Sequence, residues 1–480
     1  MASRARLIPT RPKPSEQVTW HTVKSGVFSS AELAIGQRRM EAESYLSSGY
    51  GVRRAIEGRR DWVPFGKLAG LSAPPRIKQI FVSREFGVPY LNTSQVFETR
   101  PAPRKFLATG KTSKAKDRLA AEGTILVMAS ASPGRSTLVT AAHEGSFISH
   151  HFMRVAPRDD SRAGWIYGFL RSPQGQQMMS GSQYASIIRH IEPHHVAALP
   201  VPCVSDEIAL RFTERVSEVR RLRNRAFELA EYADRLFEDA LGPIVLPQST
   251  SGFSVNSSEL TGRRRLEATF HSPVAAGISR LFKRSDRLSD ITERVWWMPR
   301  FRRFYGESGI PYMSADELFT VSPQGLKKIL VGGDESYAQY LVNPGWIVMA
   351  CSGQVYGTNG QATLVTERHK NMFFSHDLIR IIPKDGAVRA GYMLTALTHR
   401  THGRPLLIRE AYGTSIPHLD PGDVANFPVV RLDSAIEERI ADAAEESAIA
   451  RFEADACEVE LSKEAGKLID CFISGESLLA

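Results

Sequence analysis

The sequence lacks the features that mark membrane and secreted proteins. No apolar run approaches the ~18 residues that a membrane helix requires, and the basic, proline-containing residues 1–14 have no apolar centre like that of a signal peptide. The four cysteines are scattered, without the spacing of a zinc site or a disulfide framework. These absences predict a cytoplasmic chain with no metal site and no membrane contact.

Motifs of familiar enzyme classes are missing as well. The sequence has no HExxH zinc motif, no GxSxG elbow and no PDxxx(D/E)xK nuclease pattern. Residues 129–137 come near a phosphate loop, but Ala129 stands where the first glycine is needed and Arg135 replaces the lysine. Residues 343–346 lack the second proline of an adenine methyltransferase motif. We predict a chain that holds no cofactor and catalyses no reaction, with an enzyme of unrecognised motif as the alternative.

Positive charge is in excess. The chain has 61 Lys and Arg against 52 Asp and Glu, which gives a formal net charge of +9. A basic surplus favours an anionic partner, nucleic acid first, because phosphates attract Lys and Arg. A surplus that serves only solubility is the alternative.

The chain repeats itself at long range. Residues 184–193, YASIIRHIEP, return as residues 412–421, YGTSIPHLDP, and further segments match in the same order. These pairs are 39–42 with 265–268, 87–91 with 309–313, 149–157 with 375–383, and 199–201 with 427–429. Because the order and the spacing are kept, we predict two large equivalent units rather than a solenoid of short repeats.

Each unit contains short apolar runs bounded by turn residues. Their length and their content of β-branched and aromatic residues predict β-strands. These strands are expected at 123–129, 146–150 and 151–155 in the first unit, and at 345–350, 372–376 and 377–382 in the second. Short helices are expected at 165–171 and 392–398.

Two histidine pairs, at 150–151 and 194–195, raise the question of a metal site. The second unit replaces three of these four histidines with Asp377, Gly422 and Asp423. We therefore predict histidines of strand ends and turns, and no bound metal.

A long helical pattern follows each unit. From about residue 205 to 240 no proline occurs, and apolar residues alternate steps of three and four at Val219, Leu222, Ala226, Leu229, Ala233, Leu236 and Ala240. A second, alanine-rich pattern covers about 433–473, and it is acidic where the first begins basic. We predict that the two helices pair as an antiparallel coiled coil. Two separate helices, each lying on its own unit, are the alternative.

These patterns predict an α+β fold with an internal pseudo-twofold repeat. Each domain would be mixed α/β with short strands, and each would be followed by a long helix. The predicted parts are a first domain at 1–203, a helix at 204–241, a linker at 242–257, a second domain at 258–431 and a helix at 432–475.

The chain resembles the specificity subunit of Type I restriction–modification enzymes over almost its whole length. The resemblance lies in RMEA at 39–42 and RLEA at 265–268, in the GxI(x)VMA strands, and in the YxxxIxH(I/L)xP motifs. The family usually continues with a Pro-Leu-Pro segment and then a glutamine. Here the prolines match and the glutamine does not, so a divergent relative in a related phage-defence system is the alternative.

The resemblance implies a non-catalytic DNA-recognition subunit. Each target-recognition domain would read one half of a bipartite site in double-stranded DNA, and the helices would act as the spacer between the halves. The helices would also hold two DNA methyltransferase subunits, with S-adenosylmethionine bound to those partners, and restriction/translocase subunits can join. A protein-binding scaffold of a defence complex is the alternative.

Two loops in each unit are predicted to contact DNA, because recognition residues lie on loops held by a rigid scaffold and differ where the targets differ. The loop after the VMA strand offers Ser130, Ser132, Arg135 and Ser136 in the first unit, and Ser352, Gln354, Tyr356 and Asn359 in the second. The repeated motif offers Gln183, Tyr184, Ser186 and Arg189, against Tyr412, Thr414 and Ser415. Arginine suits guanine, and Gln or Asn suits adenine.

Some basic residues have two open roles. His190 and His418 match each other, and they either reach DNA or hold the turn. Five lysines in polar loops either contact phosphates or lie on the solvated surface, and both roles are equally open. These are Lys105, Lys111, Lys114, Lys327 and Lys328.

Overall fold

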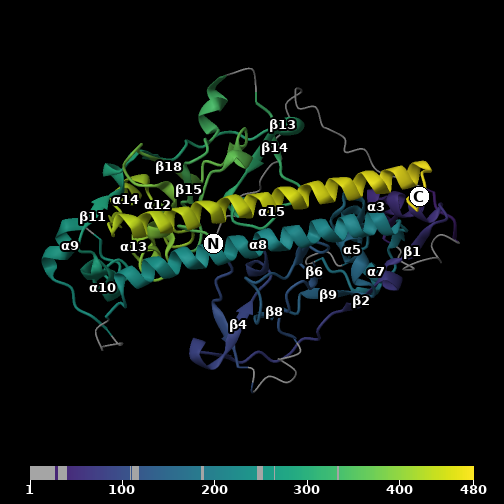
Figure 1. Cartoon of the computed structure of the whole chain (residues 1–480), viewed down its shortest axis with the longest axis horizontal. Helices are drawn as coiled ribbons and strands as arrows, with labels where there is room; N and C mark the ends of the chain where they lie inside the picture. Colours follow the sequence, from purple (N-terminus) through teal and green to yellow (C-terminus); the bar gives the residue numbers. More distant parts are fainter. Residues whose placement is uncertain are drawn as a thin grey trace, which may run out of the picture.

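Two long helices form the centre of the molecule. The computed structural model describes residues 27–30, 41–108, 110, 118–184, 189–245, 252–263, 265–331 and 335–479. The two helices lie side by side, and the sheets of the two units lie on opposite sides of them (Figure 1). Within the residues described, no helix is long and apolar enough to cross a membrane.

The first long helix, α8, spans Asp206–Leu241, and the second, α15, spans Ser434–Ser474. A polar side chain caps the start of each one, Ser205 for α8 and Asp433 for α15, by accepting a hydrogen bond from a backbone amide of the first turn. Gly475 follows the last residue of α15 and stops the helix, because its φ of +117° lies in the left-handed region that favours glycine.

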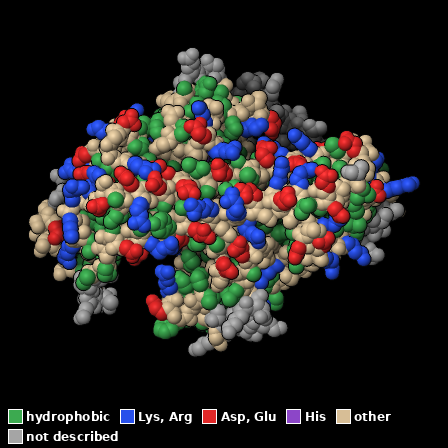
Figure 2. Space-filling view, in the orientation of Figure 1, with side chains coloured by type: hydrophobic (Ala, Val, Ile, Leu, Met, Phe, Trp, Pro, Cys, Tyr) green, Lys and Arg blue, Asp and Glu red, His purple; other side chains and the backbone are tan. Residues whose placement is uncertain are grey.

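The two helices run in opposite directions and pack along their length. Arg211, near the start of α8, pairs with Glu464, near the end of α15, at 3.0 Å, and Arg225 pairs with Glu446 at 2.9 Å. Small apolar residues let the helices approach closely in the middle, and these are Ala226, Ala230, Ala450 and Ala454. Charges of both signs are intermixed on the surface shown in Figure 2.

Each unit contains a four-stranded antiparallel sheet with the same strand order. In the first unit the order is β2 (Ala69–Ser72), β9 (Phe152–Pro157), β6 (Ile125–Met128) and β7 (Ser136–Leu138). In the second it is β12 (Thr292–Trp296), β18 (Leu378–Pro383), β15 (Ile347–Ala350) and β16 (Ala362–Leu364). Every residue of β6 and β15 is buried, which explains why these two strands are continuously apolar.

A smaller sheet and a two-stranded ribbon complete each unit. The smaller sheets are β3 (Phe81–Val82), β5 (Lys105–Leu107), β4 (Val88–Leu91) and β8 (Phe147–Ile148), and then β14 (Lys328–Ile329), β13 (Tyr305–Met313) and β17 (Phe373–Phe374). The ribbons pair β1 (Trp62–Pro64) with β10 (Pro200–Pro202), and β11 (Ser285–Arg287) with β19 (Pro428–Val430).

Shorter helices surround the sheets. The α-helices are α2 (Ala42–Leu46), α3 (Ser48–Glu57), α4 (Phe65–Leu68), α5 (Ala163–Arg171), α6 (Pro173–Gly181), α7 (Pro193–Ala197), α9 (Ser257–Arg263), α10 (Pro273–Leu281), α11 (Ala315–Leu318), α12 (Ala390–Thr398), α13 (Arg404–Ile408) and α14 (Pro421–Ala425). The 3-10 helices are η1 (Arg84–Phe86), η2 (Gln95–Phe97), η5 (Asp160–Arg162), η6 (Leu288–Asp290), η7 (Glu335–Tyr340) and η8 (Glu367–His369).

One short helix of each unit packs directly against a long helix. Helix α5 lies on α8 and α12 lies on α15. The contact is backbone to backbone, because a Cβ on Gly164 would lie 2.2 Å from the carbonyl carbon of Phe212, and one on Gly391 would lie 2.4 Å from the carbonyl oxygen of Ala441. Glycine thus fixes how closely each unit approaches its helix.

The two units also touch each other through equivalent segments. The amide of Thr99 donates to the carbonyl of Phe319 at 3.1 Å, and the amide of Val321 donates to the carbonyl of Phe97 at 2.8 Å. Phe97 and Phe319 occupy matching positions, ten residues after Gly87 and Gly309 of the repeated segments. The same stretch of each unit therefore contacts the other.

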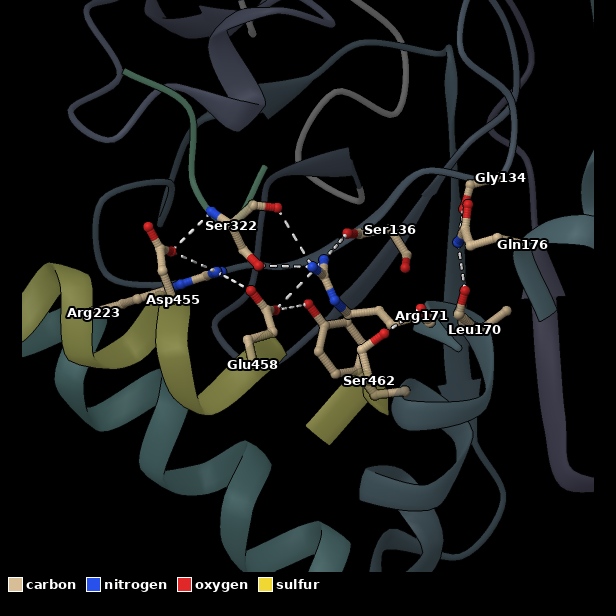
Figure 3. A network of polar contacts seen from close by, with 11 residues as sticks. Gly134, Ser136, Leu170, Arg171, Gln176, Arg223, Ser322, Asp455, Glu458 and Ser462 are labelled. Atoms are coloured by element: carbon tan, nitrogen blue, oxygen red, sulfur yellow. Dashed lines mark hydrogen bonds and ion pairs between the residues drawn. The ribbon is translucent and has the colours of Figure 1, made fainter. Parts of the chain in front are cut away.

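A buried ionic network joins the units to the helices (Figure 3). Glu458 of α15 is fully buried, and its carboxylate bonds to Arg223 of α8 and to the hydroxyl of Tyr167 of α5. Arg171 of α5 lies 3.7 Å from the same carboxylate and donates to the hydroxyl of Ser322, in the second unit, at 2.7 Å. One carboxylate thus connects both units and both long helices.

Candidate nucleic-acid interface

The repeated motif closes a small hairpin in both units. Tyr184 and His190 exchange two backbone hydrogen bonds of 3.0 Å, and Tyr412 and His418 exchange two of 2.9 and 2.7 Å. The tyrosine and the histidine that the two copies share are therefore the two ends of one hairpin. We call residues 184, 189 and 190 of the first unit and 412–418 of the second the motif hairpins; residues 185–188 lie outside the described part of the chain.

Each motif hairpin lies against the loop that follows the central strand. Ser130 forms a β-bridge with His190, and Ser352 forms one with His418. The amide after each histidine donates to the carbonyl before each serine, at 2.9 and 2.8 Å. The structure therefore brings together, in both units, the two loops that the sequence predicts to contact DNA.

Several candidate side chains are exposed at this junction. Tyr356 is 64% exposed and Tyr412 is 42% exposed, so both present aromatic faces to solvent. The other exposed candidates are Ser132, Arg189, Gln354, Thr414 and Ser415. Ser186 lies outside the described residues, as do Lys111 and Lys114.

Other candidates face the protein. The guanidinium of Arg135 lies 3.7 Å from the ring centroid of Phe97, and burial, together with the nearby charge of Arg171, lowers the pKa of Arg135 to about 10. Ser130, Ser136 and Asn359 are buried, and the amide of Asn359 donates to the carbonyl of Pro417 in the motif hairpin at 2.9 Å. These side chains shape the loops from within.

Glutamine side chains connect the two loops in both units. Gln354 donates to the carbonyl of Ser415 at 3.1 Å, and Gln183 donates to the carbonyl of Pro133 at 3.3 Å. The hydroxyl of Tyr184 donates to Glu192 at 2.6 Å, and this hydrogen bond raises the pKa of the tyrosine.

One further segment of each unit lies near these loops and was not among the residues predicted to contact DNA. Residues 75–81 read PRIKQIF, and residues 299–305 read PRFRRFY, at matching places in the two units. Both mix basic residues with apolar and aromatic ones, so the recurrence of this composition at an equivalent place in each half of the sequence is the signal that reveals them. We call these stretches the basic–aromatic segments.

The basic–aromatic segments expose cations and aromatic rings together. Phe81, Phe304 and Tyr305 are 39%, 54% and 45% exposed. Cations lie over these rings, with centroid distances of 4.8 Å for Lys105 on Phe81, 5.0 Å for Arg302 on Phe304 and 5.2 Å for Lys327 on Tyr305. Lys328 instead donates to the carbonyl of Glu307 at 2.8 Å. Exposed cations beside aromatic faces suit phosphates and bases.

Each basic–aromatic segment lies beside a histidine of the turn before β9 or β18. Arg303 contacts Nδ1 of His376 at 3.1 Å. Burial and the charge of Arg76 lower the pKa of His151, whose Nδ1 lies 2.5 Å from the hydroxyl of Ser130. In each unit the segment, the turn, the strand loop and the motif hairpin are therefore neighbours. Among the residues described, no group of three or more His, Cys, Asp or Glu is arranged to hold a metal.

No known family model matches the chain, and no curated protein matches it. Among solved structures it is similar to the S subunit of a Type I restriction-modification system from M. genitalium, at 15% identity and a TM-score of 0.32, over 86% of this chain and 95% of that one. It is also similar to the HsdS subunit from Thermoanaerobacter tengcongensis, at 16% identity and a TM-score of 0.25, over 86% of this chain and 96% of that one. These proteins are of the class that the sequence resembles.

Proposed function

We propose that the chain is the DNA-recognition subunit of a restriction–modification complex and that it catalyses no reaction itself. The observation that carries this proposal is the duplicated surface of strand loop, motif hairpin and basic–aromatic segment. Its backbone contacts are the same in both units, while its exposed side chains differ. Two similar surfaces with different side chains suit a site made of two different halves.

In this proposal the long helices set the spacing between the halves. The units would be 1–203 and 258–431, related by a pseudo-twofold axis, and the helices would form an antiparallel coiled coil. A helix of the 36 residues of α8 is roughly 54 Å long, which exceeds the ~34 Å of one turn of duplex. The resemblance adds two methyltransferase subunits on these helices, with their S-adenosylmethionine, and restriction/translocase subunits as further partners.

The experiment that tests the function is base-modification sequencing. The chain is co-expressed with its cognate methyltransferase, and the host DNA is then sequenced for methylated positions. We expect one bipartite motif that disappears when this chain is omitted. If the complex forms and no motif appears, the chain is a protein-binding scaffold and does not read DNA.

Loss of a base contact should alter one half of the motif alone. Arg189 is exposed on the first motif hairpin, and Ser415 is exposed at the tip of the second. Arg189→Ala should relax the preference at one position in one half by about 1–3 kcal/mol, and Ser415→Ala should affect only the other half. Methylation motifs of the two variants provide the measurement. A change in both halves from either variant would contradict the assignment of one half to each unit.

Loss of a phosphate contact should weaken binding to all sequences alike. Arg302 is exposed on the second basic–aromatic segment, and each neutralised phosphate contributes about 0.9 to the slope of log K against log salt. Arg302→Gln should therefore make that negative slope shallower by about 1, without changing the methylation motif. Titrations of the complex with duplex DNA between about 50 and 200 mM salt measure it. Arg60→Gln, an exposed arginine outside both segments, is the control and should leave the slope unchanged.

A further inference from the structure

A cavity of about 200 Å³ lies between the two units and the long helices. The first unit contributes Arg100 and Arg104 to its lining, and the second contributes Arg400 and Arg404. Helices α8 and α15 contribute Arg223 and Arg451, and the carboxylates of the lining are Glu98, Asp234 and Asp455. Figure 2 shows that the outline of the molecule is notched on its lower side, with Lys and Arg at the edge of the notch.

Three of the arginines have carboxylate partners that balance their charge. Arg100 bonds to Glu231 and Asp234, both at 2.8 Å. Arg104 bonds to Glu98 at 3.1 Å. Arg223 bonds to Glu458 in the network of Figure 3. Because Glu458 also lies 3.7 Å from Arg171, these four carboxylates offset four arginines, and Asp455 is the one further carboxylate of the lining among the described residues.

The other three arginines are balanced poorly. Arg404 donates to the backbone carbonyls of residues 355, 357 and 359 at 2.8–3.0 Å, and Arg451 donates to the carbonyl of Leu318 and to the hydroxyl of Thr363. Within the described part of the chain, neither lies within ion-pair distance of a carboxylate, and Arg400 reaches Glu231 only at 3.8 Å. Burial lowers the pKa of all three guanidiniums.

Unused hydrogen-bond donors lie in the same lining. The Nε groups of Arg100, Arg223 and Arg451 are buried and have no hydrogen-bond partner. Arg223 is only 8% exposed. A buried, charged donor without a partner destabilises the folded chain, because it has lost water and gained nothing in exchange. An anion in the cavity would supply the missing charge, and an acceptor for a donor such as the Nε of Arg451.

We propose that this cavity binds a phosphate group, held chiefly by Arg400, Arg404 and Arg451, with Arg104 of the first unit beside them. A phosphate has several acceptor oxygens around one centre, so it suits guanidiniums that approach from different sides. Arg104 and Arg400 are the more exposed of the set, which lets the group enter from solvent. Because these two arginines belong to different units, the bound phosphate ties the units together. The phosphate belongs either to free inorganic phosphate or to a DNA backbone.

Thermal unfolding of the full chain in sodium phosphate, compared with sodium chloride at equal ionic strength, tests the proposal. Inorganic phosphate should raise the melting temperature of the wild type, with saturation, and calorimetric titration should give a matching dissociation constant. In the double variant Arg104→Gln/Arg400→Gln, phosphate affinity should fall about tenfold or more for each lost guanidinium. Arg60→Gln should respond as the wild type does, and Arg400→Lys, which keeps the charge, should retain part of the response.

Duplex DNA distinguishes the two sources of the phosphate. If the group belongs to DNA, the double variant binds duplex more weakly and free phosphate competes with duplex for the wild type. If it is free phosphate, the double variant loses only the response to phosphate. The proposal is wrong if the double variant keeps the wild-type response to phosphate and the wild-type affinity for DNA. The phosphate titration needs no DNA, so its outcome is independent of the proposed function.

Discussion

Glu458→Gln is expected to lower the free energy of unfolding by about 3–5 kcal/mol, as the loss of one partner of a buried ion pair does. The carboxylate is fully buried and compensates two guanidiniums, those of Arg171 and Arg223. Glutamine keeps the shape and a hydrogen bond but removes the charge, so both arginines stay buried without a counter-ion. Denaturant unfolding of the purified chain measures the loss.

The control for this variant is Glu460→Gln, two residues further along α15. Glu460 is exposed and pairs with Lys463 at 2.8 Å, and surface pairs contribute only ~0–1 kcal/mol. A loss of equal size in both variants would show that the buried network is not the cause. Limited proteolysis is a second measurement. Cleavage between the two units should be faster than in the wild type for Glu458→Gln and unchanged for Glu460→Gln.

The pH dependence of this loss has a definite sign. Burial opposes ionisation of Glu458, yet Arg171, Arg223 and the Tyr167 hydroxyl hold its pKa below the usual range. A carboxylate with a lowered folded-state pKa stabilises the chain above its unfolded-state pKa, about 4.3 for glutamate, and loses that contribution as the pH falls through the folded value. The difference between wild type and variant should therefore be complete at neutral pH and shrink in acid.

Gly164→Ala and Gly391→Ala are expected to destabilise the chain by about 1–3 kcal/mol or more each. In both cases the new methyl group would overlap the backbone of a long helix, so the short helix must move outward. The effect should be similar in the two units, because α5 and α12 make the same contact. Thermal and denaturant unfolding of the two variants measure it.

Gly51 gives a matched control for these variants. It lies in helix α3, and a Cβ there would meet nothing within 4 Å. Gly51→Ala should therefore be neutral or should stabilise the chain by up to about 1 kcal/mol, since alanine favours helices more than glycine does. If all three substitutions behave alike, close packing of the short helices on α8 and α15 does not limit stability.

Much of the fold follows from local patterns in the sequence. The buried strands β6 and β15 lie within continuous apolar runs, and the capped ends of α8 and α15 follow from Ser205 and Asp433. The pairing of the motif hairpin with the strand loop could not be predicted from periodicity. It depends on backbone hydrogen bonds between segments about sixty residues apart, such as Ser130 with His190.

The candidate site was only partly predictable for a related reason. Residue type gives Arg135 and Asn359 the chemistry for reading bases, but tertiary packing turns one onto Phe97 and buries the other. The basic–aromatic segments have no strand or helix pattern, and only comparison of the two units reveals them. Burial of a charged side chain such as Arg223 depends on Glu458, which lies far away in the sequence.

The network around Glu458 makes the two halves of the chain unequal partners. Counting from the capped starts of the two helices, Ala230 holds the position in α8 that Glu458 holds in α15, and Phe227 holds that of Asp455. Two copies of α8 paired antiparallel would therefore bury Arg223 against alanine and phenylalanine, with no carboxylate to balance it. The uncompensated charge of Arg223 therefore disfavours pairing between two copies of α8, and it favours pairing of α8 with α15 of the same chain.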